Sequence, residues 1–112
     1  LYGQRRQFAR AAERYRRAIA LDPDFAVAHV NLGNIYFRQE RYDEAQVSFE
    51  RALAADSTHA NAYNSLGNLH MVQGDFSAAV MAFVRAERLE TDNGEFQRNL
   101  EIARRLKAEN VP

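Results

Sequence analysis

Amide side chains recur at helical spacing in two stretches of the sequence. The first stretch carries Asn31 and Asn34, and the second carries Asn61, Asn64, Ser65 and Asn68. Side chains three or four residues apart in an α-helix point to the same side, so each set shares one face. Asparagine is a modest helix former, and its repeated use inside a helix calls for an explanation. Each amide offers two donors and one acceptor, which can pair with the backbone of an extended peptide whatever its side chains.

Catalytic and metal-binding arrangements are not visible in the sequence. The histidines, His29, His59 and His70, lack the short spacings to one another or to glutamate that metal sites use. The serines have no nucleophile-elbow context, and the glycines occur singly rather than in a phosphate-binding loop. We therefore expect no catalytic residue, no metal, no cofactor and no enzymatic activity. His29 and His70 are expected on the buried stripes of their helices.

The two amide-bearing stretches belong to a repeat with a period of 34 residues. The run Leu32-Gly33-Asn34 recurs as Leu66-Gly67-Asn68, and Ala45, Phe49 and Ala52 recur as Ala79, Phe83 and Ala86. A period of this length is typical of stacked supersecondary units. The spacing of the apolar residues predicts two helices in each unit.

The repeat register predicts the organisation of the chain, a single domain over residues 1–112. The ranges are the second half of a repeat at 1–25, full repeats at 26–59 and 60–93, and a capping helix at 94–112. Because the sequence opens in the middle of a repeat, we expect it to be a fragment of a longer protein.

Two segments outside the full repeats are predicted to be helical. Residues 8–21 should form the second helix of the half repeat. In the tail, Asp92 or Asn93 can cap a helix beginning near Gly94. Its apolar stripe is formed by Phe96, Leu100, Ala103 and Leu106.

The turn between the two helices of a unit is expected to need a left-handed residue. Gly74 can adopt this conformation without strain in the second unit. The first unit has Glu40 at the equivalent position, where the same conformation should cost about 1 kcal/mol.

Gly33 and Gly67 are expected where the two helices of a unit cross closely. Ala45, Ala52, Ala79 and Ala86 supply small surfaces facing them, and Phe49 and Phe83 fill the space beside the small residues. Alternating large and small side chains is what interdigitating helices require.

The pattern resembles the tetratricopeptide repeat. The resemblance rests on Leu32, Gly33, Tyr36, Ala45, Phe49 and Ala52, on Leu66, Gly67, Ala79, Phe83 and Ala86, and on Ala11, Tyr15, Ala18 and Pro23. It implies an all-α, tetratricopeptide-type helical-hairpin solenoid with a C-terminal capping helix. It also implies that the first helix of each repeat lines a concave groove.

In the resembled family, the amide-bearing face points into this groove. The tail continues the row with Glu95, Arg98 and Asn99, and Asn31, Ser65 and Asn99 are each 34 residues apart. The predicted peptide-binding residues are thus Asn31, Asn34, Asn61, Asn64, Ser65, Asn68, Arg98 and Asn99. Val27, Val30 and Val72 would add an apolar patch. The alternative is that the amides bond neighbouring helices or hold the geometry between repeats, and both uses can coexist.

Some members of the resembled family clamp a C-terminal carboxylate with lysine, asparagine and arginine. The cationic positions of that clamp fall here on Val30, Asn61 and Ser65, or one repeat later on Glu95 and Asn99. None of these residues is cationic, so a carboxylate clamp of this kind is disfavoured.

The amino-acid composition limits the classes of partner that are expected for the chain. The 15 basic residues balance the 15 acidic ones, so we expect no nucleic acid and no membrane partner. The basic cluster near the start, interpreted as a solvated outer face, consists of Arg5, Arg6, Arg10, Arg14, Arg16 and Arg17. The absence of cysteine fits a reducing compartment, and we expect a cytoplasmic location.

The predicted function is a protein–protein interaction scaffold that binds a protein or peptide segment in the groove. One alternative is a self-assembly module forming a homo-oligomer through an open N-terminal edge, where Phe8, Ala11, Tyr15 and Ala18 make an apolar stripe. The other alternative is the regulatory repeat region of a larger enzyme.

Overall fold

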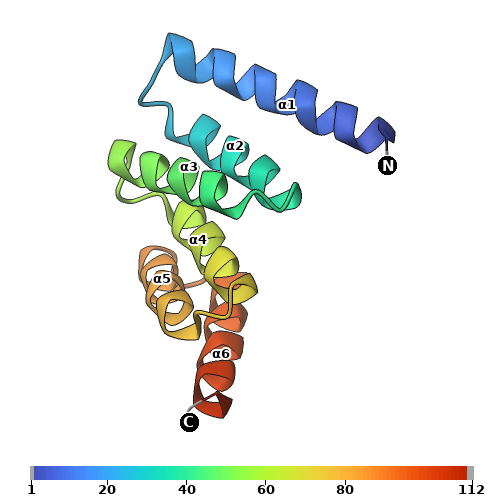
Figure 1. The fold of residues 1–112 in the computed structure, drawn as a ribbon. Helices are drawn as coiled ribbons and strands as arrows, with labels where there is room; N and C mark the ends of the chain where they lie inside the picture. Colours follow the sequence, from blue (N-terminus) through green and yellow to red (C-terminus); the bar gives the residue numbers. More distant parts are fainter. Residues whose placement is uncertain (1, 111–112) are drawn as a thin grey trace. The chain divides into compact units, whose positions relative to one another are not determined.

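The computed structural model describes residues 2–110 of the chain, and every described element is an α-helix (Figure 1). The helices are α1 (Tyr2–Leu21), α2 (Ala26–Arg38), α3 (Tyr42–Ala55), α4 (Ala60–Val72), α5 (Phe76–Leu89) and α6 (Gly94–Glu109). The predicted all-α class of helical hairpins is confirmed. The outer ends of the predicted ranges, at residues 1 and 111–112, lie outside the described residues.

The helix near the start of the chain is longer than predicted. It was expected over residues 8–21, whereas α1 begins at Tyr2. The residues before Phe8 are glutamine and arginine, which propagate a helix well, and the single Gly3 does not stop it. The sequence prediction relied on apolar spacing and therefore missed this polar first turn.

The chain divides into two compact units, residues 1–57 and residues 58–112. In the first unit, α1 packs against α2, and α2 forms a hairpin with α3. In the second unit, α4 forms a hairpin with α5, and α6 packs against α5. Each hairpin is built in the same way, because the two sequences are related by the 34-residue repeat.

Close contact between the helices of each hairpin depends on a glycine facing a phenylalanine. A Cβ atom built on Gly33 would lie 2.5 Å from Cε1 of Phe49, and one built on Gly67 would lie 2.5 Å from Cδ1 of Phe83. Both distances are far below van der Waals contact. The prediction that these glycines mark the helix crossing, with the phenylalanines beside them, is confirmed.

Small residues complete the contact surfaces. Ala45, Ala52, Ala79 and Ala86 are fully buried, as the repeat pattern predicts. Their counterparts in α1, Ala11 and Ala18, are only half-buried, as are Phe8 and Tyr15 of the same stripe. The fully buried small residue of α1 is instead Ala12.

The last helix is held by the predicted apolar stripe and by an N-cap. Leu100 and Ala103 pack with Ala79 and Phe83 of α5. Phe96 packs with Ala60 and Ala86. Of the two predicted capping residues, Asn93 is the one that caps, because its side chain accepts a 3.1 Å hydrogen bond from the backbone N–H of Phe96.

The turns inside the two hairpins share a left-handed residue. Gly74 has a φ of 78°, and Glu40 at the equivalent position has a φ of 61°. The left-handed turn is therefore kept in the first unit although its residue has a side chain. This conformation costs a non-glycine residue about 1 kcal/mol or more, because its Cβ approaches the following carbonyl oxygen.

Replacing Glu40 with glycine should relieve this strain. We expect Glu40→Gly to raise the free energy of unfolding by up to about 1 kcal/mol, part of the gain being offset by the greater freedom of glycine in the unfolded chain. Gly74→Glu is the matched opposite change and should destabilise the second hairpin. Chemical denaturation of both variants measures the effect, and a loss of stability in Glu40→Gly would contradict the strain assignment.

Candidate binding surface

The predicted binding residues lie on α2 in the first unit and on α4 and α6 in the second. In the first unit, α2 carries both amides. Asn34 is exposed and already takes part in a contact within the structure, while Asn31 is half-buried. Leu32 and Tyr36 on the opposite side of the helix are buried, as the helical spacing predicts.

The prediction of an exposed apolar patch beside the amides is wrong for one of its three valines. Val30 was expected beside the amides on the open face, but it is buried. Val27 and Val72 are exposed, each in its own unit. The apolar surface next to the amides is therefore smaller than the sequence suggests.

In the second unit, the predicted residues come from α4 and α6. Asn61, Asn68 and Arg98 are exposed, and Ser65 is half-buried and engaged in a contact. Asn64 is only 7% exposed. Its Oδ1 accepts a 2.9 Å hydrogen bond from Nδ2 of Asn99, which is half-buried on α6.

The Asn64–Asn99 hydrogen bond shows that the amides also join helices. This is the structural use that the sequence left open as an alternative. A side-chain amide that donates one N–H keeps a second N–H and its carbonyl oxygen. Asn99 can therefore hold α6 to α4 and still offer polar atoms at the edge of the surface.

We expect this pair to contribute measurably to the stability of the second unit. Asn64→Ala, Asn99→Ala and the double variant form a double-mutant cycle. The coupling energy should be about 1 kcal/mol, the usual net value of a hydrogen bond between neutral groups. Equilibrium denaturation measures it. Strictly additive effects would mean that the bond does not stabilise the folded state.

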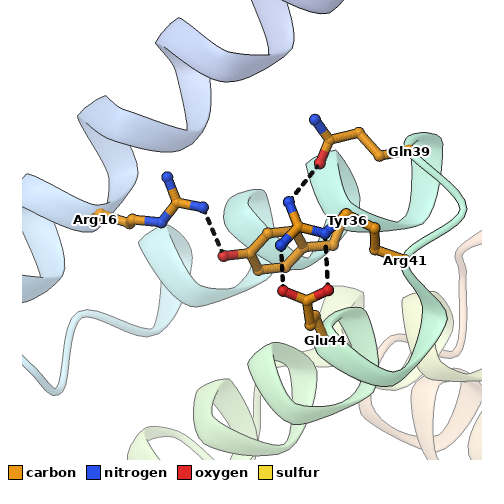
Figure 2. Close-up of polar contacts among 5 residues, drawn as sticks. All are labelled: Arg16, Tyr36, Gln39, Arg41 and Glu44. Carbon is orange, nitrogen blue, oxygen red and sulfur yellow. Dashed lines mark hydrogen bonds and ion pairs between the residues drawn. The ribbon is translucent and has the colours of Figure 1, made fainter.

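A polar cluster in the first unit was not anticipated from the sequence. We call it the Tyr36 cluster: Arg16, Tyr36, Gln39, Arg41 and Glu44 (Figure 2). Arg16 of α1 donates a 3.0 Å hydrogen bond to the hydroxyl of Tyr36. The guanidinium carbon of Arg41 lies 4.7 Å from the centre of the Tyr36 ring. An arginine over an aromatic ring is attracted by the electron-rich ring face, so Arg41 holds the Tyr36 ring within the α2–α3 hairpin. The hydrogen bond from Arg16 then ties α1 to this hairpin.

Arg41 is itself held firmly by its neighbours. Its Nε donates to one oxygen of Glu44 at 2.7 Å, and its terminal nitrogen makes a second, shorter bond to the other oxygen. The hydrogen bond from Arg41 lowers the pKa of Glu44, and the same bond raises the pKa of Arg41. The pair stabilises the fold above the unfolded-state pKa of the carboxyl, and this contribution is lost as the pH falls through the lowered folded-state pKa.

The three histidines are buried or half-buried in the fold. His29 is buried, as predicted, and its Nε2 donates a 2.8 Å hydrogen bond to the backbone carbonyl of Pro23. His59 and His70 are half-buried. In residues 2–110 there is no group of three or more histidine, cysteine, aspartate or glutamate side chains that could hold a metal ion.

None of the helices over the same residues combines the length and hydropathy that a membrane crossing needs.

Two helical hairpins related by a 34-residue repeat place this chain in the class of helical repeat proteins. Residues 1–40 match the family model described as TPR repeat, and residues 24–91 match the one described as tetratricopeptide repeat. The chain belongs to the tetratricopeptide-repeat family. Repeats of this family are generally non-catalytic protein-binding modules. The chain is a protein-interaction scaffold.

Solved structures of similar fold support the assignment. One is the first TPR of Spaghetti (RPAP3) bound to the HSP90 peptide SRMEEVD, with a TM-score of 0.86 and 22% sequence identity. Another is the NMR structure of the first TPR domain of the human RPAP3 protein, with a TM-score of 0.87 and 22% identity. Both alignments cover 96% of this chain and 85% of the other. At this identity the likeness establishes the fold, and no curated protein sequence matches the chain.

Proposed function

We propose that the chain binds an extended segment of a partner protein through the amides on the first helices of its hairpins. The observation that carries the proposal is the arrangement on α4 and α6. Asn61, Asn68 and Arg98 are exposed there, beside the Asn64–Asn99 pair that fixes α6 against α4. The Asn64–Asn99 bond fixes the helices that carry these side chains before a ligand arrives, which reduces the entropic cost of binding.

The chemistry of the surface favours recognition of the peptide backbone. A side-chain amide can pair with both a backbone N–H and a backbone C=O. The related structure of Spaghetti (RPAP3) holds an HSP90 peptide, which supports a peptide as the class of ligand. The positions where such family members place cations for a terminal carboxylate carry Val30, Asn61 and Ser65 here. We therefore propose contacts to the peptide backbone in preference to a C-terminal carboxylate.

Removing exposed amides should weaken peptide binding. The probe is a peptide selected from a random library for binding to the whole chain. Asn68→Ala, and Asn34→Ala in the other unit, should each reduce affinity by about 1 kcal/mol, or roughly fivefold, per lost hydrogen bond. Isothermal titration calorimetry measures the effect, and circular dichroism should show unchanged helicity.

Gln73→Ala provides the control for these variants. Gln73 is an exposed amide at the end of α4, outside the predicted binding residues. Its replacement should leave affinity unchanged. Equal binding by the parent chain and by the Asn34→Ala, Asn68→Ala double variant would contradict the proposed role of the amides.

A further inference from the structure

A cavity in the first unit is lined by residues other than the predicted peptide-binding amides. It is formed between the first turns of α1 and the α2–α3 turn, which lie at the same end of this unit (Figure 1). Its volume is about 660 Å³, within the range of ordinary ligand pockets. We call it the basic cavity, and its lining includes Gln4, Arg5, Phe8, Arg38, Gln39 and Arg41.

The lining of the basic cavity carries a net positive charge. Three arginines line it, against one acid, Glu40. Arg41 is held by Glu44 and Tyr36, so its guanidinium forms a fixed part of the wall (Figure 2). Within residues 2–110, the side chains of Arg5 and Arg38 have no hydrogen-bond, ion-pair or ring partner. Two guanidinium groups therefore remain available at one cavity.

The hairpin of this repeat can form without arginine at these two positions. The residues 34 positions after Arg38 and Arg41 are Val72 and Asp75, and the α4–α5 hairpin forms with them. Asp75 caps α5 by accepting a hydrogen bond from the backbone N–H of Ala78. The second hairpin therefore forms its turn without these arginines. In the first unit Arg41 is used by the Tyr36 cluster, whereas Arg38 has no such structural contact among the described residues.

We propose that the basic cavity binds aspartate or glutamate side chains of a partner protein segment. A guanidinium group pairs with a carboxylate through two parallel hydrogen bonds. Gln4 and Gln39 can donate further hydrogen bonds, and Phe8 offers an apolar wall to the methylene groups of an acidic side chain. None of the lining residues is among the predicted peptide-binding residues, so the proposal does not rest on the proposed function.

The size and the lining favour an acidic peptide over other anions. A cavity of about 660 Å³ is much larger than a single phosphate ion, for which a compact backbone nest is the usual site. Single-stranded RNA is generally held by several aromatic side chains on which bases stack, and Phe8 is the single aromatic residue of this lining. An acidic segment of a protein matches both the charge and the volume.

The experiment measures binding of a fluorescent oligoglutamate peptide to the whole chain by anisotropy at fixed ionic strength. Replacing Arg5 with glutamine and Arg38 with valine, the residue found one repeat later, should weaken binding roughly tenfold for the pair. The matched control replaces Arg10 and Arg14 of α1 with glutamine. Both are exposed and lie outside the cavity lining, so this pair should change affinity less than twofold or so.

A second variant tests the site in the opposite direction. Glu40→Gln removes the acid from the lining and should strengthen binding about twofold to threefold. Circular dichroism confirms that each variant is folded. If Arg5→Gln, Arg38→Val does not fold, the increase expected for Glu40→Gln remains decisive.

Four results would overturn the proposal. They are equal losses in the cavity pair and the control pair, equal binding of an oligoglutamine peptide, and no strengthening by Glu40→Gln. The fourth is binding of a phosphoserine peptide or an RNA oligonucleotide without binding of oligoglutamate. None of these results bears on the amides of α2 and α4, because the variants Asn34→Ala and Asn68→Ala are tested with a different ligand.

Discussion

Replacing Gly67 with leucine is expected to destabilise the second unit by about 1–3 kcal/mol or more. Even the first carbon of the new side chain would overlap the ring of Phe83, which is 1% exposed and cannot move into solvent. The remaining carbons would force α4 and α5 apart. Thermal unfolding followed by circular dichroism measures the effect, and the midpoint should fall by several degrees.

Two controls separate overpacking from general effects of substitution. Gly3 of α1 has no atom near the position of an added Cβ, so Gly3→Ala should be neutral or slightly stabilising. Asn68→Ala changes the residue next to Gly67 on the exposed side of α4 and should cost much less. A midpoint unchanged by Gly67→Leu would show that the helix crossing is not where the structure places it.

Replacing Phe96 with alanine should have the largest effect on stability, about 3–5 kcal/mol. Phe96 is 1% exposed and joins α6 to the α4–α5 hairpin through Ala60 and Ala86. Because the buried facing residues Ala60 and Ala86 are small, their side chains cannot fill the space that the ring leaves. We expect α6 to lose its attachment, which hydrogen exchange should detect as faster exchange of the α6 backbone amides.

Ile102→Ala is the matched control on the same helix. Ile102 is 46% exposed, so its truncation should cost far less than that of Phe96. Equal loss of stability in the two variants, or protection of α6 in Phe96→Ala, would contradict the assignment of Phe96 as the anchor of this helix.

The parts of the fold predicted correctly are those set by local spacing. The repeat fixes which residues are equivalent, and helical spacing identifies the buried residues of α3 and α5, whereas in α1 the buried alanine is Ala12, next to the predicted stripe. Gly33 and Gly67 were assigned to helix crossings because two helices can approach closely where one of them has no side chain. Both assignments are confirmed. The stripe of α6 followed from the same reasoning.

The features missed by sequence analysis depend on which long side chains meet in three dimensions. Arg16 and Tyr36 are 20 residues apart and lie on different helices, so no local spacing predicts their hydrogen bond. The arginine side chain has several rotatable bonds, so its guanidinium group can lie in many positions. The basic run of α1 was therefore interpreted as a solvated face. The basic cavity was missed for the same reason, because Arg5 and Arg38 are brought together only by the packing of α1 on the α2–α3 hairpin.

The candidate binding residues were only partly predictable. Helical spacing places the amides on one face, but it does not say which of them find partners inside the fold. Asn64 is buried against Asn99, whereas Asn61 and Asn68 of the same helix are exposed. The difference arises from α6, whose position over α4 depends on contacts such as that of Phe96. Val30 is buried although it neighbours the amides in sequence.

The most direct test of the account is whether a bound peptide is recognised through its backbone by the first-helix amides. A peptide selected for binding to the whole chain is titrated into isotope-labelled protein, and the side-chain amide NMR signals of Asn61 and Asn68 are followed. The same peptide is then synthesised with single backbone amides replaced by esters. We predict that these signals shift on binding and that at least one ester weakens affinity by about 1 kcal/mol. Tight binding that leaves both side-chain amides unshifted, and that tolerates every ester, would contradict the account.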